Sequence, residues 1–111
     1  MQDLNRLIDE LMVMIRDRRG ADPEQSYVAR MHSKGRLMMA QKVGEEAIET
    51  ALAAVAQERE QVVGESADLV FHLLMLWVDC GIDPKEVAHE LDRRRKIPRL
   101  DEKSAHKSKT S

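Results

Sequence analysis

The sequence predicts an all-α protein, with four to five helices bundled around a central antiparallel helical hairpin. Its apolar volume comes from Ala, Leu, Val and seven Met, whereas aromatic residues make up only 3% of the chain. Such a composition favours helix over sheet. There are only five Gly and three Pro to make turns, and apolar residues recur at helical spacing in long segments. At 111 residues, the chain has the size of one domain.

The first predicted helix lies at the N-terminus. Apolar residues recur at helical spacing from Leu4 to Ile15, Asp3 is a suitable N-cap, and Gly20 follows an arginine-rich end as a stop signal. A turn is expected over 21–25. The remaining helices are predicted over 26–32, 36–56, 62–80 and 84–95.

Each of these later helices has a start or stop signal. Ser26 is a suitable cap for the short helix, and Gly35 separates it from the long helix that follows. Gly81 ends the second long helix. Asp83 at the N-cap with Pro84 at the first helical position is a favourable start for the last one.

Composition also bounds the domain organisation and the classes of partner. Residues 1–96 are predicted to form one domain, and residues 97–111 a polar, disordered tail. A net charge of -2 argues against a general nucleic-acid binder. The N-terminus lacks the apolar core of a signal peptide, and the longest nearly apolar stretch, 69–78, is too short to cross a bilayer. We therefore expect a soluble, cytoplasmic protein without a membrane or nucleic-acid partner.

Two acidic stripes mark the long helices. In helix 36–56, Lys42, Glu45, Glu46 and Glu49 fall within an arc of about 100°, and most of the remaining circumference is apolar. A helix that is apolar on most sides is expected to be buried. Its acidic stripe should then face something specific rather than bulk water.

The second stripe lies on helix 62–80. Gln61, Glu65, Asp68 and His72 are spaced four, three and four residues apart, so they line one face of an otherwise apolar helix. A polar elbow over 57–61 is expected to make the two long helices an antiparallel hairpin. The two acidic stripes can then face each other.

Carboxylates that converge inside an apolar bundle repel one another and lose hydration unless a cation joins them. Oxygen ligands suit Mg²⁺, with Mn²⁺ as a possible substitute. The predicted metal ligands are Glu46, Glu49, Glu65 and Asp68. The competing interpretation is that these acids form ordinary solvated helix faces.

These residues also resemble a known family. Residues 41–49 resemble the Lys-x-x-Glu-Glu-x-x-Glu motif of MazG-like all-α nucleotide pyrophosphatases, and residues 65–68 resemble the Glu-x-x-Asp that follows it. More narrowly, residues 26–30, 42–46 and 67–74 resemble the phosphoribosyl-ATP pyrophosphatase family. The resemblance covers roughly residues 3–95, although the elbow lacks the Gly-Asp turn of many members.

The resemblance implies Mg²⁺-dependent hydrolysis of phosphoribosyl-ATP to phosphoribosyl-AMP and pyrophosphate, the second step of histidine biosynthesis, by a homodimer. It implies catalytic roles for the four metal ligands and for Glu45, which would lie behind the metal or act as a base. It also implies that Ser26 and Tyr27 lie near the substrate. Charge and position add Lys42, Arg30, Lys34, His72 and Arg94 as candidate substrate contacts.

Simpler roles remain open for several of these residues. Lys42 can form a salt bridge with Glu45 or Glu46, and His72 can hydrogen-bond to Asp68 or simply be buried. Ser26 and Tyr27 can be a helix cap and a core aromatic residue. Solvated positions suit Arg30 and Lys34, and a helix C-terminus favours a basic cluster such as the one containing Arg94.

Three other functions are weighed against this one. A housekeeping (deoxy)nucleoside triphosphate pyrophosphatase would use the same metal chemistry, and a non-catalytic helical dimerisation module would leave the acids in solvent. Glu86 and His89 fit one Glu-x-x-His element of a di-iron bundle. Such a site needs two of these elements, and the sequence has only one.

Overall fold

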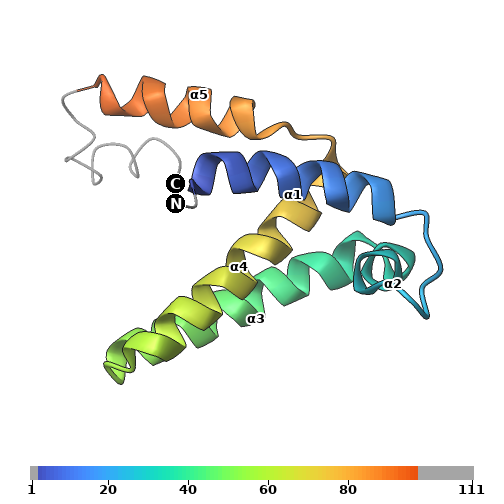
Figure 1. Cartoon of the computed structure of the whole chain (residues 1–111). Coiled ribbons are helices and arrows are strands. Elements are labelled where there is room, and N and C mark those ends of the chain that lie inside the picture. The colour runs from blue at the N-terminus through green and yellow to red at the C-terminus, as the bar shows by residue number, and fades with distance from the viewer. Residues whose placement is uncertain (1–2, 98–111) are drawn as a thin grey trace.

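The computed structural model describes residues 3–97, and within that range every regular element is a helix (Figure 1). This confirms the predicted all-α class. The helices are α1 (Leu4–Arg18), α2 (Tyr27–Lys34), α3 (Arg36–Val55), α4 (Arg59–Cys80) and α5 (Pro84–Arg95). The predicted tail, apart from Ile97, lies outside the described residues.

Most of the predicted start and stop signals act as expected, but Gly20 does not cap α1, which ends at Arg18 with Arg19 as its C-cap. The Asp3 side chain accepts a hydrogen bond from the Asn5 backbone N–H, and Ser26 caps α2 by accepting one from the Ala29 backbone N–H. α2 extends two residues beyond the predicted 26–32 and ends before Gly35, whose φ of 99° favours glycine. Asp83 and Glu86 form a capping box at the start of α5.

The elbow between the long helices is shorter than the predicted 57–61, because α4 already begins at Arg59. The chain reverses over three residues. Gln57 adopts a left-handed conformation with φ of 60°, its backbone N–H donates to the Ala54 carbonyl, and the Glu58 N–H donates to the Ala53 carbonyl. The polar character of residues 59–61 predicts a loop, but their side chains are compatible with a helix start, and α4 includes them.

α3 and α4 form the predicted antiparallel hairpin, and α1 packs against α4 (Figure 1). The hydrophobic core lies where α1 and α2 cover the C-terminal half of α4 and the start of α3. Its buried side chains are Met12, Ile15, Val28, Met31, Met39, Leu74, Met75 and Val78. The elbow half of the hairpin projects beyond this core.

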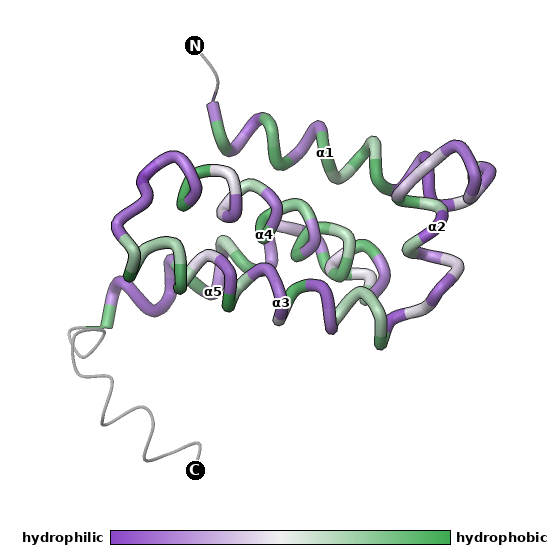
Figure 2. Tube along the Cα trace, turned by 90° about the horizontal axis from the view of Figure 1, so that it is seen from below, coloured by the Kyte–Doolittle hydropathy of each residue, from purple (hydrophilic) through white to green (hydrophobic). Residues whose placement is uncertain are grey.

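Within the single chain, α3 is far less buried than its apolar circumference predicts. Its only buried residues are Met39, Glu46 and Ala53. Hydrophobic segments run along both α3 and α4 in Figure 2. The large hydrophobic side chains of α3 that are exposed are Leu37, Ile48, Leu52 and Val55.

α4 is long and apolar enough to cross a membrane by composition alone, with a mean hydropathy of 1.3 in its most apolar window. The apolar stretch 69–78 alone does not reveal this property, because the extra length comes from the preceding turns of α4, which combine Val and Ala with few charges. Core helices of water-soluble proteins pass the same test. Since α4 packs against both α1 and α3, its apolarity does not indicate a membrane protein.

Candidate metal and nucleotide site

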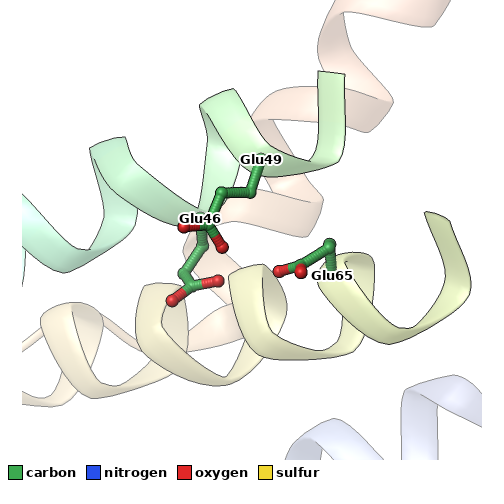
Figure 3. A group of neighbouring side chains, drawn as sticks. All are labelled: Glu46, Glu49 and Glu65. Atoms are coloured by element: carbon green, nitrogen blue, oxygen red, sulfur yellow. The ribbon is translucent and has the colours of Figure 1, made fainter. Parts of the chain in front are cut away.

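Three glutamates from the facing stripes meet across the hairpin. Glu46 and Glu49 come from α3, Glu65 comes from α4, and one carboxylate oxygen of each lies within 4.8 Å of the others (Figure 3). Glu46 is buried, Glu65 is half-buried and Glu49 is exposed. We call this group the acid cluster. It contains three of the four predicted metal ligands.

The acid cluster is electrostatically unfavourable without a cation. Oε1 of Glu46 and Oε1 of Glu65 are shielded from solvent and lack a hydrogen-bond partner within the described part of the chain. Burial raises the pKa of Glu65, and the neighbouring carboxyl groups of Glu46 and Glu49 raise it further. A bond from the Gln61 amide to the Glu65 carboxylate (2.9 Å) acts in the opposite direction.

Lys42 is the cation that pairs with this group. Its Nζ atom lies 3.5 Å from carboxylate oxygens of both Glu45 and Glu46, one turn along α3. Partial burial acts to lower the pKa of Lys42, but Tyr27, Glu45 and Glu46 together outweigh that effect and raise it. The simpler role predicted for Lys42, a salt bridge, is therefore present, and the ammonium is placed at the edge of the acid cluster.

Glu45 and Asp68 lie outside the acid cluster. Glu45 is exposed, and the Gln41 amide donates to its carboxylate (2.9 Å); this bond lowers the pKa of Glu45, with Lys42 adding to the effect. Asp68 is exposed one turn beyond Glu65 on α4. Whether its carboxylate joins a metal remains a prediction. Its backbone carbonyl is the group to which His72 hydrogen-bonds.

His72 and Tyr27 link α4 to α2. His72 is only 6% exposed; its Nδ1 lies 2.7 Å from the Asp68 carbonyl and its Nε2 lies 2.7 Å from the Tyr27 hydroxyl. The Tyr27 ring stacks on Phe71 and is 37% exposed, so it is not the core aromatic that its sequence position suggested. Burial raises the pKa of Tyr27, while the charge of Lys42 acts to lower it.

The remaining predicted substrate residues have local structural roles. Ser26 caps α2, and the Arg30 guanidinium lies over the Tyr27 ring while donating to the Pro23 carbonyl. Lys34 is exposed in the last turn of α2. Arg94 bonds to Glu90 on its own helix at 2.9 Å.

Sequence reasoning missed one polar cluster. The Arg36 Nε donates to the Asp79 carboxylate (2.7 Å), its Nη2 donates to the Asp79 carbonyl, and His32 lies 3.7 Å from the same carboxylate. This cluster joins the α2–α3 junction to the end of α4. No local signal could have found it, because 43 residues separate Arg36 from Asp79.

The arrangement can hold a hard divalent cation. The acid cluster offers only oxygen ligands, and two of its buried oxygens have no other partner in the described residues. A divalent ion would satisfy both oxygens and remove the carboxylate repulsion. The acid cluster is open to solvent at Glu49 and has Lys42 beside it. With a cation bound, an anionic ligand such as a polyphosphate could approach from this open side.

Comparison with known proteins leads to the same chemistry. Residues 8–95 match the family described as phosphoribosyl-ATP pyrophosphohydrolase. A phosphoribosyl-ATP pyrophosphatase from Paramagnetospirillum magneticum is 45% identical over 105 residues, which cover 95% of this chain and 96% of the relative. One from Rhodospirillum rubrum is 48% identical over 101 residues (91% and 86%), and one from Saccharolobus solfataricus is 44% identical over 92 residues (83% and 98%).

Proposed function

Because the chain belongs to the phosphoribosyl-ATP pyrophosphohydrolase family, we propose that it hydrolyses phosphoribosyl-ATP to phosphoribosyl-AMP and pyrophosphate in histidine biosynthesis. The acid cluster is the structural observation that supports this reaction. Three carboxylates beside one ammonium repel a polyphosphate unless a cation binds both the carboxylates and the phosphates.

We further propose that Glu46, Glu49 and Glu65 hold Mg²⁺, with Mn²⁺ as a substitute and Asp68 as the fourth ligand. When bound, the ion offsets phosphate charge and makes water a better nucleophile. Lys42 then neutralises a phosphate oxygen at the edge of the cluster, and its attraction to Glu45 and Glu46 keeps the ammonium there before substrate arrives. In this proposal Glu45 either lies behind the metal or accepts a proton from the attacking water.

A pyrophosphate-release assay tests the reaction. Phosphoribosyl-ATP is offered beside ATP, dUTP, dCTP and dGTP, each with Mg²⁺ and with chelator. We expect Mg²⁺-dependent release from phosphoribosyl-ATP. Glu49→Gln should reduce it at least about 100-fold, because one ligand of a charge-neutralising ion is lost. Glu60→Gln is the matched control, since Glu60 is an exposed acid in the first turn of α4, outside the cluster.

The other outcomes identify the alternatives. A preference for a free nucleoside triphosphate would identify a housekeeping pyrophosphatase with the same acid cluster. If no substrate releases pyrophosphate and Mg²⁺ leaves thermal stability unchanged, only the helical dimerisation module remains.

We also propose that the enzyme acts in the cytoplasm as a homodimer. Leu37, Ile48, Leu52 and Val55 fall within an arc of about 60° on α3, on the side opposite Glu46. These four side chains are between 63% and 84% exposed, which a soluble helix seldom tolerates without a partner. A second copy of the same stripe is the simplest cover, because isologous contacts generate closed dimers.

A further inference from the structure

Two glutamates of the acid cluster, Glu46 and Glu65, are each held by a side chain of their own helix. Lys42 comes four residues before Glu46, and Gln61 comes four residues before Glu65, so each partner lies one turn away on the same helix face. The Lys42 ammonium lies 3.5 Å from Oε2 of Glu46. The Gln61 amide nitrogen donates to Oε2 of Glu65 over 2.9 Å. In both glutamates, one carboxylate oxygen therefore already has a partner.

The other oxygen of each carboxylate is available to a metal ion. Oε1 of Glu46 and Oε1 of Glu65 are shielded from solvent and have no hydrogen-bond partner among residues 3–97. Glu46 is only 7% exposed, so bulk water is a poor substitute for a partner there. Figure 3 shows the Glu65 side chain directed across the hairpin toward the glutamates of α3. Each of the two residues thus offers one oxygen rather than two.

Ligands that offer one oxygen suit Mg²⁺ better than Ca²⁺. Mg²⁺ requires a near-ideal octahedron with ligands at roughly 2.1 Å, whereas Ca²⁺ takes about six to eight ligands at roughly 2.3–2.6 Å and often uses both oxygens of a carboxylate. A carboxylate whose second oxygen is already bonded does not readily turn to present both. Because the Gln61 amide is neutral, it occupies Oε2 of Glu65 without adding a positive charge that would repel the ion.

We propose that Gln61 is a positioning residue that holds Glu65 as a one-oxygen ligand and thereby makes the acid cluster prefer Mg²⁺ to Ca²⁺. The inference rests on the proposed function only in requiring that the acid cluster bind a divalent cation. The competing explanation is that the bond between Gln61 and Glu65 merely stabilises the first turns of α4, as pairs at this spacing do. A bond with that role alone would leave the relative affinities for the two cations unchanged.

Displacement of Mn²⁺ from the full chain by Mg²⁺ or by Ca²⁺, followed through the electron paramagnetic resonance signal of free Mn²⁺, separates these explanations. Gln61→Met removes the amide donor at nearly constant volume. We expect this change to weaken Mg²⁺ binding about tenfold, as the loss of a group that orients a ligand does. Ca²⁺ binding should be nearly unchanged, because Glu65 can then turn both oxygens toward the larger ion. The wild-type preference for Mg²⁺ over Ca²⁺ should therefore fall about tenfold.

Gln61→Lys tests the same idea with a donor retained. Its ammonium would stand four residues before Glu65, as that of Lys42 stands four residues before Glu46. The added charge should weaken the binding of both cations, but the preference for Mg²⁺ should remain because Oε2 is still occupied. A preference lost in Gln61→Lys as fully as in Gln61→Met would contradict the proposal.

The matched control is Gln41→Met. The Gln41 amide donates to the Glu45 carboxylate over the same 2.9 Å and at the same spacing, but Glu45 lies outside the acid cluster, so both cation affinities should be unchanged. The proposal is overturned if Gln61→Met keeps the wild-type preference, if Gln41→Met loses as much of it, or if the wild type does not prefer Mg²⁺. A wild type that binds no Mn²⁺ would overturn the metal site and this inference together. A wild type that binds Mn²⁺ but releases no pyrophosphate from phosphoribosyl-ATP would overturn the proposed reaction alone.

Discussion

At the residue scale, Glu65 is the member of the acid cluster whose negative charge is least favoured. Its Oε1 is shielded from solvent without a partner, and burial together with Glu46 and Glu49 raises its pKa. The ionised form of Glu65 is therefore disfavoured by its surroundings, and the proposed divalent ion would favour it.

Replacing Glu65 with Gln should consequently have opposite effects in the two conditions. In chelator we expect a higher Tm, because one of three repelling carboxylates is gone. With Mg²⁺ at about 100 times its Kd, the wild type should gain about 2.7 kcal/mol, and the variant should lose most of this gain. Thermal unfolding with Mg²⁺ and with chelator measures both effects. Glu60→Gln should retain the Mg²⁺ response, and an equal response in Glu65→Gln would contradict the assignment.

At the scale of single elements, the turn between α3 and α4 carries local strain. Gln57 has φ of 60°, a left-handed conformation that glycine adopts at little cost and other residues do not. The flanking hydrogen bonds to the Ala53 and Ala54 carbonyls are those of a helix that normally ends on glycine.

Gln57→Gly should therefore stabilise the protein by about 0.5–1 kcal/mol, even though glycine increases the entropy of the unfolded chain. Urea unfolding measures the difference. Ala56→Gly is the matched control: Ala56 has φ of -76°, so glycine relieves nothing there and should destabilise. A destabilised Gln57→Gly would show that the turn is not strained.

Exposed ion pairs lie in the C-terminal half of α5. Hydrogen bonds from Arg93 and Arg94 lower the pKa of Glu90 to about 2, against an ordinary value of 4.5. A carboxyl group whose pKa is lower in the folded than in the unfolded protein stabilises the fold at any pH above its unfolded-state pKa. This stabilisation is lost as the pH falls to the folded-state pKa. Here that window runs from about pH 4.5 to about pH 2.

Glu90→Gln should thus lower stability slightly at pH 7 and not at pH 2. The effect should be small and should shrink in high salt, because the pair is exposed to solvent. Urea unfolding of both proteins across this pH range provides the test. A difference that persists unchanged at pH 2 would mean that the carboxylate charge is not its cause.

At the scale of the whole molecule, the hairpin projects beyond the core and carries its apolar stripe uncovered (Figures 1 and 2). The acid cluster lies on the same projecting hairpin. A partner packed on the stripe would exclude water from one side of Glu49 and Glu45, which strengthens charge interactions at the site.

Ile48→Asp combined with Leu52→Asp should convert the proposed dimer to monomers, because that dimer would bury two charges on each stripe without partners. Sedimentation velocity measures the mass directly. Leu91→Asp is the matched control, since Leu91 is 61% exposed but lies on α5. A wild type that sediments as a monomer at high concentration would contradict the proposed assembly.

The sequence alone determined the helices, because spacing, caps and glycine stops are local signals. Asp3, Ser26, Gly35 and Gly81 act as their residue types predict. The sequence did not predict the bounds of the elbow correctly. Gln57, which follows α3, adopts a conformation that glycine usually signals, and the polar residues 59–61 resemble a loop.

The sequence also placed Glu46, Glu49 and Glu65 on facing stripes, because helical periodicity fixes which side chains share a face. Tertiary structure decided which of them meet, since the register of α3 against α4 depends on packing along the whole hairpin. It likewise decided that Tyr27 reaches His72, 45 residues away. Contacts across such separations depend on how helices cross, and local sequence does not encode that geometry.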